Sequence, residues 1–527
     1  MCTFRQRSRS RVVTFLAFIA LTMTSNLGLR LTAQTVTGTI RGTVLDSSGS
    51  VVPNAAIVVT NQDTGVIRNS ASTGDGVYTI PSLLAGKYTV EAKAEGFSTA
   101  QAKDAVVTVG SDTRVDLTLQ VGSTAQNVVV TVATTTIETS TAEVSQLMDQ
   151  ASIADKPLNS RDLQQLAVIQ PGVQYNNYSP FGKQLSVIGD RPTHNRYLQE
   201  GTDLTWTYRT AANSLPSGVL LGVEAVKEFR VLTTDFPAEY GELSGGVINT
   251  TFKSGGNSFH GSAYEFYRNG ALDAKNFFDR RVSVAGDQLG TPPLDRNQFG
   301  ASFGGPIKKD RTFFFINYEG FRLNASDSFV ANLPTDAQRA LAVPSVYNVF
   351  FAPGTGGTGG SLLPQCNGPN LPGSSTLCFF SSNPIHHVDE HYGLVKIDHS
   401  FGNKNTLSAT YNIDPSYGYE PVQTGATADD QYQRRQTFTI ADAQILSSNT
   451  VNSIRFGLNR IYYNSEVDIV GDASKLSPAL FVNPTPRVHE EQFPAGSYHQ
   501  RGRRNASIRQ RRLAVCVRTA LDRLHVR

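Results

Sequence analysis

The residue types best suited to chemistry occur in one short run, His387-Val388-Asp389-Glu390-His391, which fits a zinc-binding H-x-x-E-H pattern. Such a pattern works on a helix, where both imidazoles share one face and the glutamate can activate a metal-bound water. Pro384 stands just upstream, however, and residues 392–398 read as extended chain immediately downstream. The sequence therefore favours a strand here. A zinc peptidase would require bound metal that is lost when His387 or His391 is changed.

The rest of the chain offers little for covalent chemistry. The glycine run at 356–360 lacks the Lys-Ser/Thr of a phosphate-binding loop, and no nucleophile elbow is present. We therefore assign no catalytic residue, no metal ligand and no cofactor, and we expect a protein that is not an enzyme. The net charge of +3 over 527 residues gives no indication of a nucleic-acid partner.

Export is indicated by the N-terminus. Residues 1–33 combine several arginines with a short apolar core and a small-residue cleavage site, which is typical of a cleaved signal peptide. A single membrane anchor is the alternative, but the apolar core is short for a spanning helix. An exported chain meets an oxidising compartment. A disulfide is therefore predicted between Cys366 and Cys378, which lie close together in a loop rich in glycine and proline.

From about residue 246 onward, strand-like stretches alternate with very short turns at one end and long connections at the other. The short turns lie at 255–257, 308–310, 402–404 and 447–449, and the long connections at 269–296, 323–391 and 415–436. This asymmetry is typical of an outer-membrane β-barrel. Within 406–413 the odd positions are apolar and the even ones polar, which predicts one lipid-facing and one wet face. A soluble sandwich is the alternative, and the asymmetry of the connections favours the barrel.

Residues 38–121 contain several short strands at roughly ten-residue spacing, which predicts a β-sandwich. The segment Ser72-Thr73-Gly74-Asp75-Gly76-Val77-Tyr78-Thr79-Ile80-Pro81, followed by Leu84-Ala85-Gly86-Lys87-Tyr88-Thr89-Val90, resembles the carboxypeptidase regulatory-like domain. The resemblance implies an accessory scaffold or interaction module without catalytic groups.

Residues 122–136 are small and polar apart from one apolar run that begins at Asn127. Taken alone, this run is an ordinary edge strand. Its place after the sandwich makes it resemble the energy-coupling box of TonB-dependent receptors, which pairs with the sheet edge of a partner by strand addition. The candidate TonB box is Val128, Val129, Val130, Thr131 and Val132.

Residues 137–245 read as a mixed α+β unit, with short helices expected at 145–151 and 160–169. The order of its motifs resembles the plug domain of TonB-dependent receptors of the Oar-like type. These motifs include Gln170-Pro171-Gly172-Val173, Ile188-Gly189-Asp190-Arg191-Pro192, Val226-Lys227-Glu228-Phe229 and Ser254-Gly255-Gly256-Asn257. Gly189, Asp190 and Arg191 form the plug motif. One departure is Glu200-Gly201, where an Asp usually precedes the glycine, and there we expect only a blurred local turn.

The resemblance implies a mainly β protein with an N-terminal β-sandwich, an α+β plug and an incomplete transmembrane antiparallel β-barrel over 246–484. It implies an outer-membrane receptor of a Gram-negative bacterium that takes up a glycan, peptide or metal chelate. The implied partners are the TonB-ExbB-ExbD complex, which draws on the inner-membrane proton gradient, and the outer-membrane lipid. A surface adhesion protein, which binds a partner without uptake, is the alternative.

The C-terminal part departs from this pattern. A barrel that holds such a plug needs many more strands than the roughly eight that can be counted between 246 and 463, because eight-stranded barrels are filled by their own side chains. The resemblance implies about 22 strands in the full barrel. Residues 485–527 lose the alternation and are crowded with arginine. A basic tail can indicate a nucleic-acid arm, but an exported barrel offers it no such partner. We therefore expect a truncated or frameshifted gene model. If the tail is real, the product is expected to be a nonfunctional fragment as far as transport is concerned.

Overall fold

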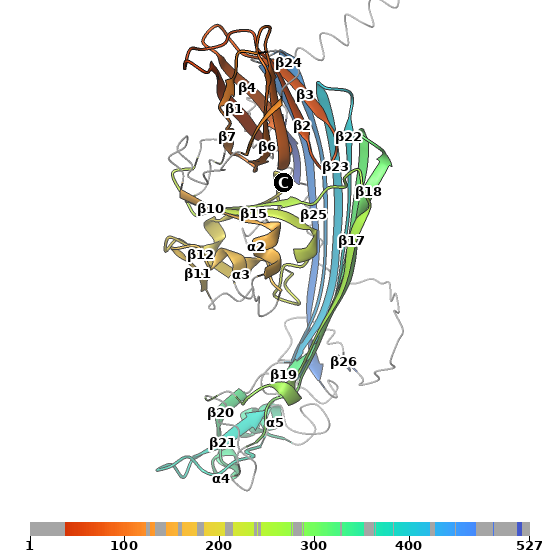
Figure 1. Ribbon diagram of the computed structural model, residues 1–527. Coiled ribbons are helices and arrows are strands. Elements are labelled where there is room, and N and C mark those ends of the chain that lie inside the picture. Colours follow the sequence, from red (N-terminus) through yellow and green to blue (C-terminus); the bar gives the residue numbers. More distant parts are fainter. Residues whose placement is uncertain are drawn as a thin grey trace, which may run out of the picture.

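The computed structural model shows three main bodies, which are a sandwich, a smaller mixed domain and a tall curved sheet (Figure 1). None of the helices in the described part of the chain is long and apolar enough to cross a membrane. The described residues are 37–122, 127–131, 144–155, 161–176, 184–205, 214–236, 240, 244–275, 277, 287, 289–326, 329–352, 363, 365–382, 384–421, 427–447, 450–470, 488–489 and 514–518.

The sandwich forms because alternate residues of its strands are apolar. In β1 (Gly38–Asp46), Ile40 and Val44 are fully buried between more exposed neighbours, which is the pattern of a half-buried strand. One sheet has the order β4-β1-β7, with β8 also paired to β1, and the other has the order β3-β2-β5-β6-β9. The other strands are β2 (Ala56–Asn61), β3 (Ile67–Ala71), β4 (Val77–Leu83), β5 (Gly86–Lys93), β6 (Thr99–Val107), β7 (Asp112–Arg114), β8 (Leu117–Leu119) and β9 (Asn127–Thr131).

The mixed domain, called the plug below, is built on a five-stranded sheet of order β10-β15-β16-β13-β14. It lies on the inner side of the tall sheet, below the sandwich in the view of Figure 1. Its elements are β10 (Val144–Asp149), α2 (Gln150–Asp155), α3 (Gln164–Ala167), β11 (Val173–Asn176), β12 (Gln184–Val187), η1 (Pro192–His194), β13 (Arg196–Gln199), β14 (Thr202–Asp203), η2 (Val223–Ala225), β15 (Val226–Thr234) and β16 (Val247–Phe252).

Two expectations about the plug were wrong. The helix expected at 145–151 is mostly strand β10, because pairing with β15 carries Met148 into the core, and α2 follows it. The barrel was expected to begin at residue 246. Strand β16 instead pairs with β13 and β15 of the plug, so the plug continues to Phe252. All six residues of β16 are buried, which fits an inner strand of a small domain.

Within the described residues, the tall sheet, called the wall below, contains nine strands in the order β17-β18-β19-β22-β23-β24-β25-β26, with β27 also paired to β25. Neighbouring strands are antiparallel from β17 to β25. Its elements are β17 (His260–Asn269), η4 (Gly270–Leu272), β18 (Leu294–Lys308), β19 (Thr312–Ser326), β22 (Ile385–Ser400), β23 (Asn405–Pro421), β24 (Thr427–Ser447), β25 (Thr450–Val470), β26 (Val488–His489) and β27 (Ala514–Arg518).

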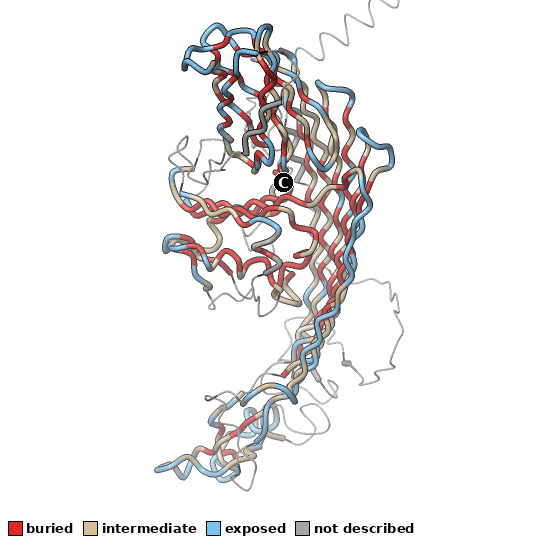
Figure 2. Tube along the Cα trace, in the orientation of Figure 1, coloured by how far each residue is buried: buried red, intermediate tan, exposed pale blue. Residues whose placement is uncertain are grey.

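Alternation along the wall separates two faces. On β23, Thr410 and Asn412 are buried toward the plug while Tyr411 points outward and is exposed. Buried and exposed positions alternate in the same way along neighbouring strands in Figure 2. The strands are longer than the sequence predicts, because β22 begins at Ile385 and β23 continues to Pro421, inside segments expected to be loops. The plug covers a part of this polar face, where Asn412 meets Gln199, and the wall extends beyond the plug in both directions (Figure 1).

A small outer module connects β19 to β22 at the end of the wall far from the sandwich (Figure 1). It contains a two-stranded antiparallel sheet and two short helices. They are β20 (Phe329–Pro334), α4 (Asp336–Arg339), α5 (Pro344–Phe350) and β21 (Leu377–Ser382).

Candidate functional site

The candidate site is the contact between the plug and the inner face of the wall. A single apolar cluster joins the two bodies, since Phe229 and Leu221 of the plug belong to it together with Phe315, Tyr392 and Leu394 of the wall. Apolar area removed from water stabilises a contact in proportion to its size. The plug and the wall therefore share one core.

The polar centre of this contact is a tight hairpin, β13–β14, called the anchor hairpin below. Its two turn residues, Glu200 and Gly201, both have positive φ, at 47° and 71°, as a two-residue type I′ turn requires. Left-handed backbone is costly for a residue with a Cβ. The Glu200 side chain nevertheless fits, because its carboxylate lies 2.7 Å from Nζ of Lys396 on β22 and accepts the Phe252 N–H at 2.8 Å.

This ion pair lies out of water, since the side chains of Lys396 and Glu200 are 4% and 7% exposed. The lysine also donates to the Phe252 carbonyl at 3.3 Å. Buried charges are costly unless paired and hydrogen-bonded, and here each partner has a further contact. The pair thus ties the turn of the plug to the middle of the wall.

The anchor hairpin touches three more wall strands. Asn412 Nδ2 of β23 donates to Gln199 Oε1 at 2.7 Å, and the hydroxyls of Thr202 and Thr439 of β24 lie 2.6 Å apart. Asn459 Nδ2 of β25 donates to the Asp203 carbonyl at 3.2 Å. One hairpin therefore contacts four successive wall strands, β22, β23, β24 and β25.

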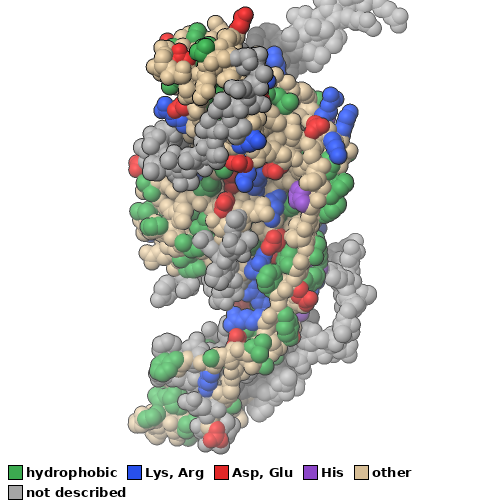
Figure 3. All heavy atoms as spheres, in the orientation of Figure 1, with side chains coloured by type: hydrophobic (Ala, Val, Ile, Leu, Met, Phe, Trp, Pro, Cys, Tyr) green, Lys and Arg blue, Asp and Glu red, His purple; other side chains and the backbone are tan. Residues whose placement is uncertain are grey.

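A second polar contact lies toward β18 and β19. The Gly222 N–H donates to Glu319 Oε2 at 2.9 Å, and Gln298 donates to the other carboxylate oxygen. Nearby, Arg161 of the plug pairs with Glu224 at 2.6 Å and stacks over the ring of Phe266 on β17 at 4.1 Å. Figure 3 shows Lys and Arg side chains gathered along the inner side of the wall.

Sequence reasoning missed the anchor hairpin. Its signal was present as Glu200-Gly201, which departs from the expected Asp-Gly and was dismissed as a blurred turn. The structure shows why the departure matters, since the Glu200 carboxylate is the group that meets Lys396. What could not be read from the sequence is the partner, because Lys396 lies 196 residues away on an otherwise ordinary strand.

The plug motif Gly189, Asp190 and Arg191 forms a turn away from the wall. Gly189 has a φ of 75°, and Asp190 Oδ1 accepts the Arg191 N–H at 2.7 Å and contacts His194 Nδ1 at 2.8 Å. Hydrogen bonds from the Ser244 side chain and from the Arg191 N–H lower the pKa of Asp190 to about 2. This geometry makes the motif a rigid corner of the plug, and its role in function stays a prediction.

The candidate TonB box coincides with β9, except for Val132, which lies outside the described residues. Strand β9 runs parallel to β6 of the sandwich, with Val128 opposite Ala100 and Val130 opposite Ala102. The segment is extended, as strand addition requires. In this structure the sheet edge that it occupies belongs to the same chain.

The histidine motif lies on a strand, as the sequence favours. His387, Asp389 and His391 point outward from β22 while Glu390 points toward the plug and is fully buried. Histidines four residues apart on a strand are separated by about 13 Å, so they cannot share one metal ion. No group of three or more potential ligands that could hold a metal occurs among the described residues.

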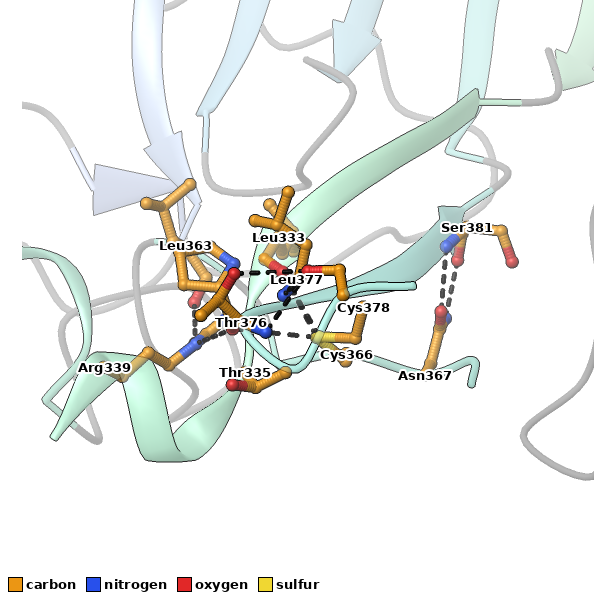
Figure 4. Close-up of a disulfide and its surroundings, with 12 residues drawn as sticks. Leu333, Thr335, Arg339, Leu363, Cys366, Asn367, Thr376, Leu377, Cys378 and Ser381 are labelled. Carbon is orange, nitrogen blue, oxygen red and sulfur yellow. Dashed lines mark hydrogen bonds between the residues drawn. A yellow bond between two sulfur atoms is a disulfide. The ribbon is translucent and has the colours of Figure 1, made fainter. Parts of the chain in front are cut away.

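Cys366 and Cys378 are joined by a disulfide in the outer module, with their Cα atoms 5.9 Å apart (Figure 4). Beside it, Arg339 donates to the carbonyls of Pro334 and Leu363, and Asn367 exchanges two hydrogen bonds with Ser381. These bonds tie the helix α4 and the returning chain to the two-stranded sheet.

Comparison with known proteins agrees with this geometry. Residues 251–510 match the model of an outer membrane beta barrel domain, and residues 39–120 match that of a carboxypeptidase regulatory-like domain. The TonB-dependent transporter Oar of Myxococcus xanthus is 29% identical over 293 residues, which cover 53% of this chain and 26% of Oar.

Among solved structures, the outer membrane transporter YddB of Escherichia coli is similar with a TM-score of 0.40 and 12% identity, over 61% of this chain and 39% of YddB. The siderophore receptor PirA of Acinetobacter baumannii has a TM-score of 0.35 and 14% identity, over 62% of this chain and 45% of PirA.

The two matched domains define an outer-membrane β-barrel protein with an N-terminal carboxypeptidase regulatory-like module. More particularly, the chain is a homologue of the TonB-dependent transporter Oar, and its matches indicate the outer membrane of a Gram-negative cell. The chain spans 26% of the length of Oar. The activity of Oar therefore does not carry over to this chain without a test.

Proposed function

We propose that this chain takes part in energy-coupled uptake across the outer membrane, with the plug as the gate and the TonB-ExbB-ExbD complex as the source of force. The observation that supports this most directly is the anchor hairpin, which seats a separate domain on four successive wall strands through polar contacts. A gate must be held firmly at rest and still have a second arrangement that a partner can favour.

The candidate TonB box, Val128 to Val132, would take the force by strand addition to TonB. Its position immediately before the plug suits this role, because tension there reaches the plug through a short connection. The substrate class stays open among glycan, peptide and metal chelate. No covalent chemistry is assigned, and the named relatives are transporters and receptors.

The test is deletion of residues 127–132 in the full-length protein. We expect loss of energy-dependent uptake of labelled glycan, peptide or chelate probes, with binding of the same probe to the cell surface retained. A cysteine at position 129 should also cross-link to TonB in cells. Unchanged uptake after the deletion would contradict the proposal.

A second function, surface adhesion, is favoured by the outer module. A two-stranded sheet with two helices and a disulfide, at the outer end of the wall, is an ordered display rather than a plain loop. Removal of residues 329–382 that abolishes attachment, combined with a box deletion that changes nothing, would favour adhesion over uptake.

A further inference from the structure

The sandwich is seated on the rest of the molecule at the end of the wall where the short turns lie (Figure 1). Its own turn at 61–65 meets two of them. The N–H and the side chain of Asn257 donate to the carbonyls of Asp63 and Thr64, both at 2.8 Å. Asn257 is itself held by Asp310, with contacts of 2.7 and 2.9 Å. The Ser254-Gly255-Gly256-Asn257 motif thus forms part of a docking surface.

In a second contact, two plug side chains of opposite charge bind the backbone of one sandwich residue, Val109. The Val109 N–H donates to Glu228 Oε2 at 2.8 Å, and the Val109 carbonyl accepts from Arg230 Nη1 at 2.7 Å. Glu228 and Arg230 are each 6% exposed. Both belong to β15, and Glu228 is part of the Val226-Lys227-Glu228-Phe229 motif, so a second plug motif also holds the sandwich.

Two further cations complete the contact between the sandwich and the rest of the molecule, which is called the sandwich seam below. Lys227 donates to the carbonyl of Ala85, and Arg68, which is 5% exposed, donates to Thr406 and to the carbonyl of Gly402 at 3.4 Å. Most of these contacts are directed at backbone carbonyls or N–H groups. The seam therefore depends on the shape of the docked backbone.

No apolar cluster bridges this seam among the described residues. The sandwich core draws its members from 40–119, whereas the cluster shared by plug and wall draws its members from 148–394. Interfaces between domains that are polar and separate from the cores allow relative motion by default. The sandwich is therefore a body of its own, joined to its seat by hydrogen bonds and charges.

The energetics of this seam suit a contact that opens. Burial raises the pKa of Glu228 and lowers the pKa of Lys227, which shows that both charges are kept from water at a cost. On opening, these groups return to water and recover their hydration, which offsets the lost hydrogen bonds. An apolar seam has no such compensation.

We propose that the sandwich is a releasable cap, which covers β15 of the plug and the short turns at rest and undocks as a unit when tension is applied through residues 127–131. This proposal rests on the uptake function, because it takes TonB as the source of tension. Strand β9 carries that tension to the sandwich through its pairing with β6, and its C-terminal side leads on to the plug. The cap must then leave before, or together with, movement of the plug.

The test is a cross-link across the seam in full-length protein in cells, with Cys516→Ser to remove a competing thiol. Cysteines replace Thr64 and Asp310, which are linked through Asn257, and a short bismaleimide reports docking. A matched control pair, at Gln62 and Thr89, lies inside the sandwich, where the two side chains are 3.2 Å apart. We expect cross-linking at the seam to fall severalfold in energised cells compared with cells treated with a protonophore, with the control pair unchanged.

The outcomes separate the cap from the uptake function. Equal seam cross-linking in both conditions, while a cysteine at 129 still cross-links to TonB, would overturn the cap and leave the uptake function standing. Absence of any cross-link between position 129 and TonB would remove both.

A second measurement needs no partner. In purified protein, Glu228→Gln combined with Arg230→Met should speed amide exchange at 61–65 and at Val109 severalfold without changing exchange in the anchor hairpin. Glu91→Gln, on β5 of the sandwich and outside the seam, serves as the matched control. Unchanged exchange at 61–65 in the double variant would show that these charges do not hold the cap and would overturn the proposal.

Discussion

The two seams of this molecule are built on opposite principles. Between plug and wall, a shared apolar core surrounds a buried Lys396–Glu200 pair, so the two bodies lose stability together when either is damaged. Between the sandwich and its seat, contacts are polar and the cores are separate. The difference teaches that buried apolar area holds the plug, whereas hydrogen bonds and charges directed at backbone groups hold the sandwich. The two contacts should therefore respond differently to mutation.

The largest effect is expected at the buried pair. Lys396→Met leaves the Glu200 carboxylate buried without its cation, which costs about 3–5 kcal/mol. Exchange of the amides at 196–203 should rise sharply while that at 61–65 stays unchanged. The double variant with Glu200→Gln should recover much of the loss, and exposed Lys404→Met is the control. Equal loss in the single and double variants would show that the two charges are not coupled.

A cavity in the shared core should come next. Leu394→Ala removes a fully buried side chain of β22 from the cluster that joins plug and wall, at about 2–5 kcal/mol. Amide exchange, measured as the temperature is raised, should show faster exchange in plug and wall together. If the sandwich seam loosened to the same degree, the contrast between the two seams would fail.

A smaller effect is expected at the sandwich seam. Gly110 has a φ of 70°, and a Cβ there would lie 2.9 Å from Arg230 Nη1. Gly110→Ala should therefore add about 1–2 kcal/mol of backbone strain and also weaken docking. Gly96→Ala is the matched control, since its φ is 82° and nothing lies within 4 Å. Exchange at 61–65 should rise only for Gly110→Ala, and equal rises would assign the effect to strain alone.

The smallest effect is expected at Asp190, which belongs to neither seam. Its pKa of about 2 in the folded protein lies below the usual 3.8. The resulting stability is therefore present above about pH 4 and is lost as the pH falls through 2. Asp190→Asn should lower the unfolding temperature slightly at pH 7 and not at pH 2. A penalty that persists unchanged at pH 2 would contradict this account.

Much of the fold could be predicted from the periodicity of the strands. The β-sandwich and the lipid-facing alternation of 406–413 follow from the two-residue period of a strand, which is a local property. The helix expected at 145–151 is instead a strand, because it pairs with the edge of β15, more than 70 residues away. The assignment of β16 failed for the same reason, since its pairing with β13 cannot be seen from its own residues.

The site was predictable only in part. The motifs at 226–229 and 254–257 stood out in the sequence, but their contacts with the sandwich depend on backbone groups of residues such as Val109 and Thr64, whose identities give no signal. Charges that pair across the fold, such as Arg230 or Lys396, look like ordinary surface residues until the chain is folded.

The length of the wall strands has a further consequence. Strands β24 and β25 contain 21 residues each, and about 9–11 residues of a tilted strand cross the membrane. Outward apolar residues such as Ile440 and Phe456 lie toward the short turns, whereas Arg434 and Tyr462 lie nearer the other end. Roughly half of each strand therefore extends beyond the lipid on the side of the outer module. The disulfide-linked module at its tip is where a large molecule approaching the cell would make first contact.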